Sequence, residues 1–267
     1  MDLQLAGKVA LVTGSNRGTG EAIARKLAAE GASVAVHGPG PGDADPVVAA
    51  IGAAGGTAAA LAGDIATDAG AEQAAGQALA AFGGVDILIN NYGTTAPGSW
   101  DTAASADWVS IYEKNVISAA RMIRLLLPQM RRRSWGRVLQ IGTIGTTRPN
   151  ARMPHYYASK GALANMTVSL AKELAGSGIT VNTVSPGLIK TREVEATYRK
   201  RAAREGWGED WAAIESRIAA EVMPNLVGRI ARVEEVADLV AFVVSPRADF
   251  ITGVNIRIDG GSVDYVT

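Results

Sequence analysis

Short apolar runs alternate with longer amphipathic segments along this chain of 267 residues. Residues 9–12 are apolar at every position, which is typical of a strand buried on both faces, and each interval between runs is long enough for a helix. This alternation predicts an α/β fold: an open, doubly wound parallel sheet of the Rossmann type. We expect about seven strands, at residues 9–13, 33–37, 57–62, 86–90, 137–141, 180–185 and 255–258.

Two longer segments carry helical periodicity. From Tyr156, apolar residues recur at helical spacing as far as Leu174, and glycines follow as stop signals. A second long helix is predicted from about residue 108 to 130. The regular alternation lapses over a charged stretch at about residues 191–226. We expect one domain, residues 1–267, in which this stretch is a substrate lid.

The lid prediction has an alternative. The stretch carries four large apolar side chains that are able to close over a carbonyl compound. The same side chains are equally able to shield a small core of their own. They are Tyr198, Trp207, Trp211 and Met223.

Composition excludes several kinds of partner. Lys plus Arg (26) balance Asp plus Glu (26), which argues against nucleic acid. The chain has no cysteine and only two histidines, His37 and His155, so we expect no disulfide and no metal site. No run approaches the roughly 20 apolar residues that cross a bilayer, and the N-terminus lacks a signal-peptide pattern. We therefore expect a cytoplasmic protein with no membrane partner.

A glycine-rich turn lies between the first predicted strand and the helix after it. Glycines allow a backbone to turn sharply and to approach a pyrophosphate, while free N–H groups and the helix dipole hold the anion. In this position the turn predicts nucleotide binding. The candidate residues are Gly14, Ser15, Asn16, Arg17, Gly18, Thr19 and Gly20.

The glycine spacing, G-x-x-x-G-x-G, resembles that of the short-chain dehydrogenase/reductase family. Further matches to that family follow in order and cover nearly the whole chain. The segment 228–243 is similar to the tail of 3-oxoacyl-thioester reductases, and the resemblance implies a homotetramer. The matching residues are Asp64, Asn90-Asn91-Tyr92-Gly93, Asn115, Thr143, Tyr156-Tyr157-Ala158-Ser159-Lys160, Pro186-Gly187 and 253–261.

The end of the second strand bears on the choice of cofactor. An NAD-selective site usually places an acid there, whereas an NADP site needs a cation near the 2'-phosphate. Here the strand ends at His37 and Gly38, and no acid follows until Asp43. Arg17 stands where related NADP-dependent reductases carry a basic residue. NADP(H) is favoured, NAD(H) stays open, and His37 is a candidate for the adenosine pocket.

The resemblance implies further cofactor contacts. Asp64 and the backbone of Ile65 would contact the adenine, and Asn91 and Gly93 would flank the riboses. Tyr92 replaces a smaller family residue and would narrow the site. Around the nicotinamide carboxamide, the resemblance implies Pro186, Gly187, Leu188, Ile189 and Thr191.

Tyr156 and Lys160 are four residues apart, so a helix places them on one face. Reduction of a ketone by hydride needs an acid for the developing alkoxide, and a phenol of pKa near 10 is too weak at neutral pH. A unit charge about 4 Å away is worth about 4 kcal/mol at an effective dielectric constant of about 20, which lowers the pKa by up to about 3. We therefore expect Tyr156 to titrate near neutrality.

The family resemblance assigns the remaining roles. Tyr156 would be the general acid in reduction and the base in oxidation, and Lys160 would also bind the nicotinamide ribose. Thr143, thirteen residues before Tyr156, stands in place of the family's serine and would hold the substrate carbonyl. Thr146 or Thr147 are alternatives to it. Asn115 would help a water molecule to reach the lysine.

These residues predict an oxidoreductase that interconverts a ketone and a secondary alcohol, similar to 3-oxoacyl-thioester reductases. Related NAD-dependent alcohol, steroid and diol dehydrogenases share the pattern. Sugar-nucleotide epimerases and dehydratases of the same fold are normally longer. A dinucleotide sensor without turnover is the non-enzymatic alternative, and the intact Tyr156 and Lys160 pair argues against it.

Overall fold

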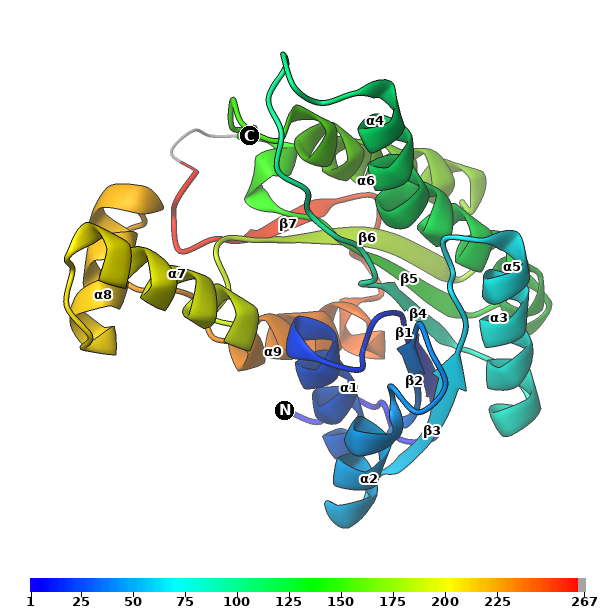
Figure 1. Ribbon diagram of the computed structural model, residues 1–267. Helices are drawn as coiled ribbons and strands as arrows, with labels where there is room; N and C mark the ends of the chain where they lie inside the picture. The colour runs from blue at the N-terminus through cyan, green and yellow to red at the C-terminus, as the bar shows by residue number, and fades with distance from the viewer. Residues whose placement is uncertain (264–267) are drawn as a thin grey trace.

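The computed structural model describes residues 1–263. Seven parallel strands form one sheet in the order β3-β2-β1-β4-β5-β6-β7 (Figure 1). Each strand lies within one residue of its predicted position at either end, and the doubly wound α/β fold is confirmed. The strands are β1 Val9–Val12, β2 Ser33–Gly38, β3 Thr57–Ala62, β4 Ile87–Asn90, β5 Gly136–Ile141, β6 Ile179–Pro186 and β7 Asn255–Ile258.

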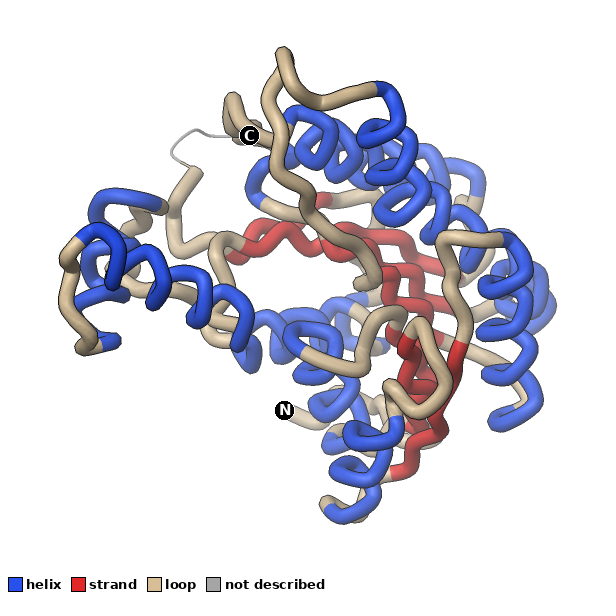
Figure 2. Tube along the Cα trace, in the orientation of Figure 1, coloured by secondary structure: helices blue, strands red, loops and turns tan. Residues whose placement is uncertain are grey.

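Helices cover both faces of the sheet (Figure 2). Along β1, Val12 joins the core on one face and Leu11 joins the core on the other, because successive side chains of a strand point in opposite directions. The first face is covered by α1 Gly18–Ala29, α2 Asp45–Ala53 and α9 Val233–Val243, and the second by α3 Asp68–Phe82, α5 Ser118–Arg133 and α6 Pro154–Glu173.

The second long helix predicted from the sequence contains a change of helical type. It begins as α4, Ser105–Tyr112, passes through a π-helical turn, η1 Glu113–Ile117, and continues as α5. Such turns occur frequently at functional sites. Asn115 lies in this one and is 1% exposed.

The segment after β6 forms α7 Arg192–Glu205, α8 Trp211–Arg217 and a π-helical turn, η3 Ile218–Val222. In Figure 1, α7 and α8 project from the sheet. We call residues 191–226 the lobe. It has an apolar cluster separate from the two sheet cores. Ala202, Ile214 and Ile218 of the lobe are buried there with Ile230, which follows the lobe, and Trp207 and Trp211 pack against them.

The strand order reverses between β1 and β4. In doubly wound sheets, ligands bind beyond the carboxyl ends of the strands at such a point. Here the ends of β1 and β4 carry the glycine turn and Asn91.

Across residues 1–263, none of the helices is both long enough and apolar enough to cross a membrane.

Candidate active site

The glycine turn needs its glycines for two reasons. Gly14 and Gly18 have φ angles of +61° and +58°, which side chains rarely adopt. A Cβ on Gly20 would lie 2.4 Å from Nδ2 of Asn91, so the turn packs directly against the end of β4. Asn91 reinforces this contact by donating from Nδ2 to the carbonyls of Thr13 and Gly14. These contacts fix the position of the start of α1 at the edge of a cleft.

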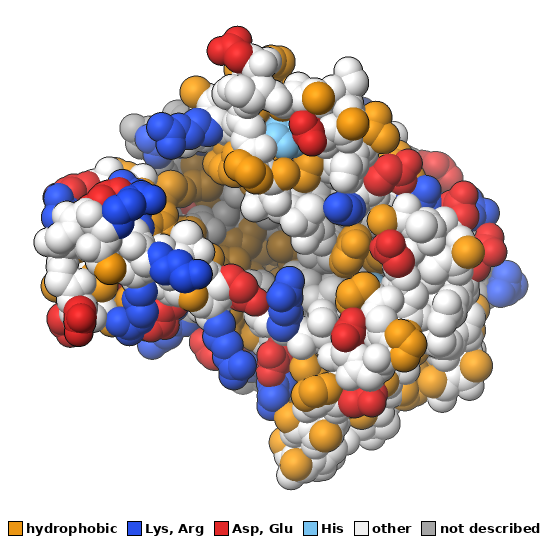
Figure 3. Space-filling view, viewed as in Figure 1, with side chains coloured by type: hydrophobic (Ala, Val, Ile, Leu, Met, Phe, Trp, Pro, Cys, Tyr) orange, Lys and Arg blue, Asp and Glu red, His pale blue; other side chains and the backbone are white. Residues whose placement is uncertain are grey.

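That cleft runs along the carboxyl edge of the sheet and has a volume of about 830 Å³. Figure 3 shows it as the hollow between the lobe and the body of the molecule. Fifteen of the residues predicted for the site line it. They are Gly14, Arg17, Gly18, Thr19, Gly20, Asn91, Gly93, Thr143, Tyr156, Lys160, Pro186, Gly187, Leu188, Ile189 and Thr191.

Two predicted cofactor residues lie beneath the turn. The side chains of Ser15 and His37 are fully buried. The Ser15 hydroxyl donates to Val12 O at 2.6 Å and accepts from His37 N–H at 2.9 Å. The expectation that His37 belongs to the adenosine pocket therefore needs correction, because both nitrogens of its ring are bonded to backbone. Both residues support the turn from below.

The adenine end of the predicted site is more open. Asp64 is exposed, and its Oδ1 accepts from Ala66 N–H at 3.1 Å and from the Tyr92 hydroxyl at 3.4 Å. The side chain of Ile65 is 1% exposed and belongs to the core, so only its backbone is available to a ligand. Asn16 is half-buried beside Gly38, at the end of β2.

Tyr156 and Thr143 meet at the wall of the cleft. The Thr143 hydroxyl is hydrogen-bonded to the Tyr156 phenol, and the ring centroids of Tyr156 and Tyr157 are 5.2 Å apart. Of the alternatives to Thr143, Thr146 has its hydroxyl buried, and Thr147 donates its hydroxyl to Ile144 O at 3.3 Å. Of the three threonines, Thr143 is thus the one that lines the cleft and is bonded to the phenol.

The expectation that Tyr156 titrates near neutrality is wrong for this structure. Burial raises the pKa of Tyr156 to about 12, and the hydrogen bond from Thr143 opposes this rise only in part. Lys160 is buried as well, and burial lowers the pKa of its amine to about 8. The phenol is consequently protonated at neutral pH, which is the form that donates a proton in reduction.

Lys160 is anchored at the floor of the site. Its Nζ donates to Ile141 O at 2.8 Å. A Cβ on Gly93 would lie 3.5 Å from this Nζ and 2.7 Å from Oδ1 of Asn115, so a glycine is needed where these side chains converge. The hydrogen bond from Lys160 to the carbonyl of Ile141 could not be predicted from the sequence, because every residue has a backbone carbonyl.

Asn115 joins two segments beside Lys160. Its Oδ1 accepts from Thr94 N–H at 2.8 Å, and its Nδ2 donates to Thr94 O at 3.0 Å and to Ser159 Oγ at 2.9 Å. Ser159 in turn donates to Tyr156 O. The π-helical turn thus fixes the loop after β4 against α6, next to Tyr156. Sequence reasoning did not assign Thr94 or Ser159 to this framework.

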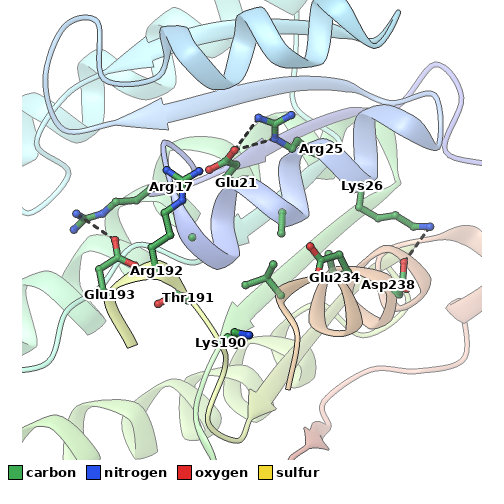
Figure 4. A pocket seen from close by; sticks show the side chains of 14 residues that line it. Arg17, Glu21, Arg25, Lys26, Lys190, Thr191, Arg192, Glu193, Glu234 and Asp238 are labelled. Atoms are coloured by element: carbon green, nitrogen blue, oxygen red, sulfur yellow. Dashed lines mark hydrogen bonds and ion pairs between the residues drawn. The ribbon is translucent and has the colours of Figure 1, made fainter. Parts of the chain in front are cut away.

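Arg17 connects the turn to the lobe. Its guanidinium lies 3.6 Å from the carboxylate of Glu193, in the first turn of α7, and both side chains are more than half exposed. The pair lies at the edge of a second groove of about 680 Å³, between α1, α9 and the start of α7 (Figure 4). Other charges along this groove are paired too, including Lys26 with Asp238 at 3.1 Å.

The residues along the main cleft fit a dinucleotide. At Gly18, an added Cβ would be in ordinary contact with Cγ2 of Thr191 at 3.8 Å, so Thr191 borders the glycine turn. The cleft continues from this cradle to Tyr156 and Lys160. No group of three or more potential metal-ligating side chains occurs among residues 1–263.

Comparisons with known proteins agree with this geometry. The chain is 35% identical to the uncharacterized oxidoreductase YvaG of Bacillus subtilis (strain 168) over the full length of both. It superimposes on L-sorbose reductase from Gluconobacter frateurii, complexed with NADPH and L-sorbose, with a TM-score of 0.94, 32% identity and full coverage of both chains. With 3-oxoacyl (acyl-carrier-protein) reductase from Agrobacterium tumefaciens C58, with NADP bound, the TM-score is 0.86 at 35% identity, covering 97% and 96% of the chains.

A family profile described as short chain dehydrogenase matches residues 8–202. This range contains the glycine turn, Thr143, Tyr156 and Lys160. The chain belongs to the short-chain dehydrogenase/reductase family and is an NAD(P)-dependent oxidoreductase.

Proposed function

We propose that the protein is an NADP(H)-dependent oxidoreductase that interconverts a ketone and a secondary alcohol, with a 3-oxoacyl thioester as its first candidate substrate. One observation carries the proposal. The Tyr156 phenol, bonded to Thr143, opens on the same cleft as the glycine turn, and Lys160 of the same helix lines that cleft too. The Agrobacterium tumefaciens relative is named as a 3-oxoacyl reductase and has NADP bound.

Each reacting residue has a defined task in reduction. A nicotinamide cofactor, when bound, would supply the hydride that the carbonyl carbon accepts. Thr143 donates a hydrogen bond to the carbonyl oxygen, and Tyr156 transfers its proton to that oxygen as the alcohol forms. Lys160, whose amine is bonded to Ile141 O, would bind the ribose of the cofactor with that charged amine, and Asn115 keeps the neighbouring loop in place. In oxidation the proton returns to Tyr156.

Two features support NADP(H) over NAD(H). Arg17 offers an exposed cation at the turn, where a 2'-phosphate gains a charge-assisted hydrogen bond. The nearest acid after β2, Asp43, accepts from Gly40 N–H at 2.7 Å and caps its own turn. Both nucleotide-bound structures named above contain NADPH or NADP.

A hydroxylated ketone is the second candidate substrate. The superposition on L-sorbose reductase covers both chains completely. The cleft near Tyr156 is also rich in hydrogen-bonding side chains, which suit a substrate with several hydroxyl groups. They include Thr94, Thr95, Asn150, Tyr157 and Ser262. On the opposite wall, Tyr198, Val222 and Met223 of the lobe offer apolar surface to an acyl chain.

A panel of carbonyl substrates tests these alternatives. It contains a 3-oxoacyl thioester, a ketose, a steroid ketone and a simple aliphatic ketone, each assayed with NADPH and with NADH. Turnover of any of them rejects the dinucleotide-sensor alternative. The substrate with the highest kcat/KM identifies the class, and a higher value with NADH than with NADPH would overturn the cofactor assignment.

Tyr156→Phe tests the mechanism with the preferred substrate. We expect kcat to fall about a hundredfold or more, while the Kd for NADPH stays unchanged. A rate equal to that of the original protein would reject Tyr156 as the acid.

The assembly and the organisation of the chain are proposals on the same family resemblance. We propose a cytoplasmic homotetramer of single-domain subunits, in which the lobe serves as a substrate lid. Sedimentation analysis measures the assembly state, and a monomer at micromolar concentration would refute the tetramer.

A further inference from the structure

His37 is bonded to the glycine turn at three points. Gly14 N–H donates to Nδ1 of the imidazole at 2.9 Å. The backbone N–H of His37 donates to Ser15 Oγ at 2.9 Å, and its carbonyl accepts from Ser15 N–H at 2.9 Å. On the far side, the ring's Nε2 lies 2.9 Å from Gly63 O, beyond the end of β3. One residue of β2 therefore links the turn after β1 to the loop after β3.

These partners determine which nitrogen of the ring carries the proton. A backbone N–H is a donor only, so Nδ1 must be the acceptor of the Gly14 bond. A carbonyl is an acceptor only, so Nε2 must carry the hydrogen. The ring is fully buried, and no water reaches it to replace either bond. The neutral Nε2–H tautomer satisfies both contacts at once.

We propose that His37 is a positioning residue for the dinucleotide: its neutral imidazole sets the conformation of the glycine turn without touching the ligand. The proposal rests on the proposed cofactor function, because its test measures the binding of NADPH. It differs from a contact in the adenosine pocket, because the side chain lies beneath the turn and is 0% exposed.

Protonation of His37 would disrupt this arrangement. A hydrogen on Nδ1 would face the Gly14 N–H, and two donors would then oppose each other. Burial lowers the pKa of His37, while Gly63 O and the carboxylate of Asp64 act in the opposite direction. The ring of Tyr92 packs edge-on against the imidazole at 6.3 Å and is bonded through its hydroxyl to Asp64. The neutral form of the ring is thus favoured at neutral pH, and a fall in pH favours the protonated form.

Three substitutions separate the two ring contacts. His37→Asn keeps an acceptor near the place of Nδ1, whereas His37→Gln keeps a donor near the place of Nε2 and leaves Gly14 N–H without its acceptor. His37→Leu removes both. The Kd for NADPH is measured by fluorescence titration, kcat at saturating cofactor, and the melting temperature without ligand.

We expect Kd to rise about tenfold in the Gln and Leu variants, because a buried donor loses its partner, and by less than about threefold in the Asn variant. We expect kcat to change by less than about twofold in all of them, since the reacting groups are untouched. If the Leu variant does not fold, the Kd values of the Asn and Gln variants still test whether the acceptor at Nδ1 is needed. Equal Kd values for Asn and Gln would overturn the proposal, as would a fall in kcat at unchanged Kd. Failure of the original protein to bind NADPH would instead reject the cofactor function.

Nuclear magnetic resonance tests the tautomer directly. The chain has two histidines, so a long-range ¹H–¹⁵N spectrum contains two imidazole patterns, and His37→Asn identifies the one that remains as His155. We expect His37 to show a protonated Nε2 and a bare Nδ1 at pH 7. The Nδ1–H tautomer would overturn the proposal.

The pH dependence of NADP⁺ binding supplies a further comparison. Because burial lowers the pKa of His37 below the ordinary histidine value, the ring takes up a proton only under more acidic conditions. As pH falls into that range, we expect affinity to weaken more in the original protein than in His37→Asn. The 2'-phosphate titrates equally in both, so the ratio of the two Kd values isolates the histidine. A ratio that stays constant down to the lowest pH at which both proteins remain folded would contradict the role of the neutral ring.

Discussion

Replacement of Lys160 by methionine should make the protein more stable at neutral pH while abolishing its activity. Lys160 is 6% exposed, and burial lowers the pKa of its amine from 10.5 to about 8. A shift of about 2.5 units corresponds to about 3 kcal/mol of destabilisation when the amine is charged. The lost hydrogen bond from Nζ to Ile141 O offsets about 1 kcal/mol of this. The net gain at pH 7 is about 2 kcal/mol, or a rise of about 4 to 8 °C in melting temperature.

The sign of the effect should change with pH. Below pH 8 the amine is charged in both the folded and the unfolded chain, so the full cost of its burial is present. Between pH 8 and 10.5 only the unfolded chain binds the proton, and the stability of the original protein rises relative to that of the variant. Above pH 10.5 only the lost hydrogen bond remains, and Lys160→Met should be the less stable protein by about 1 kcal/mol.

Thermal unfolding from pH 7 to 10.5 measures this difference. Lys172→Met is the matched control, because Lys172 lies on the same helix and is exposed. Its difference from the original protein should stay near zero throughout. A Lys160→Met variant that is less stable at pH 7, or a difference that does not vary with pH, would refute the reasoning.

Three further predictions concern the cleft. Thr143→Val should lower kcat by at least about tenfold, because the carbonyl oxygen loses its hydrogen bond. Thr143→Ser keeps the hydroxyl and should keep most of the rate. Equal rates for the Ser and Val variants in steady-state assays would contradict this. Arg17→Ala should raise the KM for NADPH about tenfold or more and leave that for NADH nearly unchanged, and a parallel rise with both cofactors would count against a 2'-phosphate contact. Asn115→Leu should lower the melting temperature by several degrees, because it leaves the backbone of Thr94 without its partner; calorimetry that detects no change would argue against the framework role.

The sheet was predictable because strands buried on both faces leave continuous apolar runs between helix-length intervals. The same pattern located the glycine turn, and helical spacing brought Tyr156 and Lys160 to one face of α6. Single residues of the site were harder to assign. In the sequence, His37 is a polar residue at the end of a strand. Only the folded chain shows that its two ring nitrogens are hydrogen-bonded to the backbone of Gly14 and Gly63.

The electrostatics of the site could not be read from residue types. The sequence indicated that Lys160 lies near Tyr156, and a charged neighbour lowers the pKa of a phenol. Burial acts on both groups in the structure, raising the pKa of Tyr156 and lowering that of Lys160. Desolvation depends on all the atoms around a group, which no local spacing encodes. The contact of Arg17 with Glu193 likewise joins residues far apart in the chain.

The separate apolar cluster of the lobe has a consequence for how this enzyme can diversify. Ala202, Ile214 and Ile218 pack mainly with neighbours from the same stretch of chain, so changes among them leave the two sheet cores intact. Tyr198 and Met223 of the lobe meanwhile line the main cleft, where we propose that the substrate binds. Grafting residues 191–226 from a relative should therefore transplant substrate preference while the turn, the phenol and the amine keep their places.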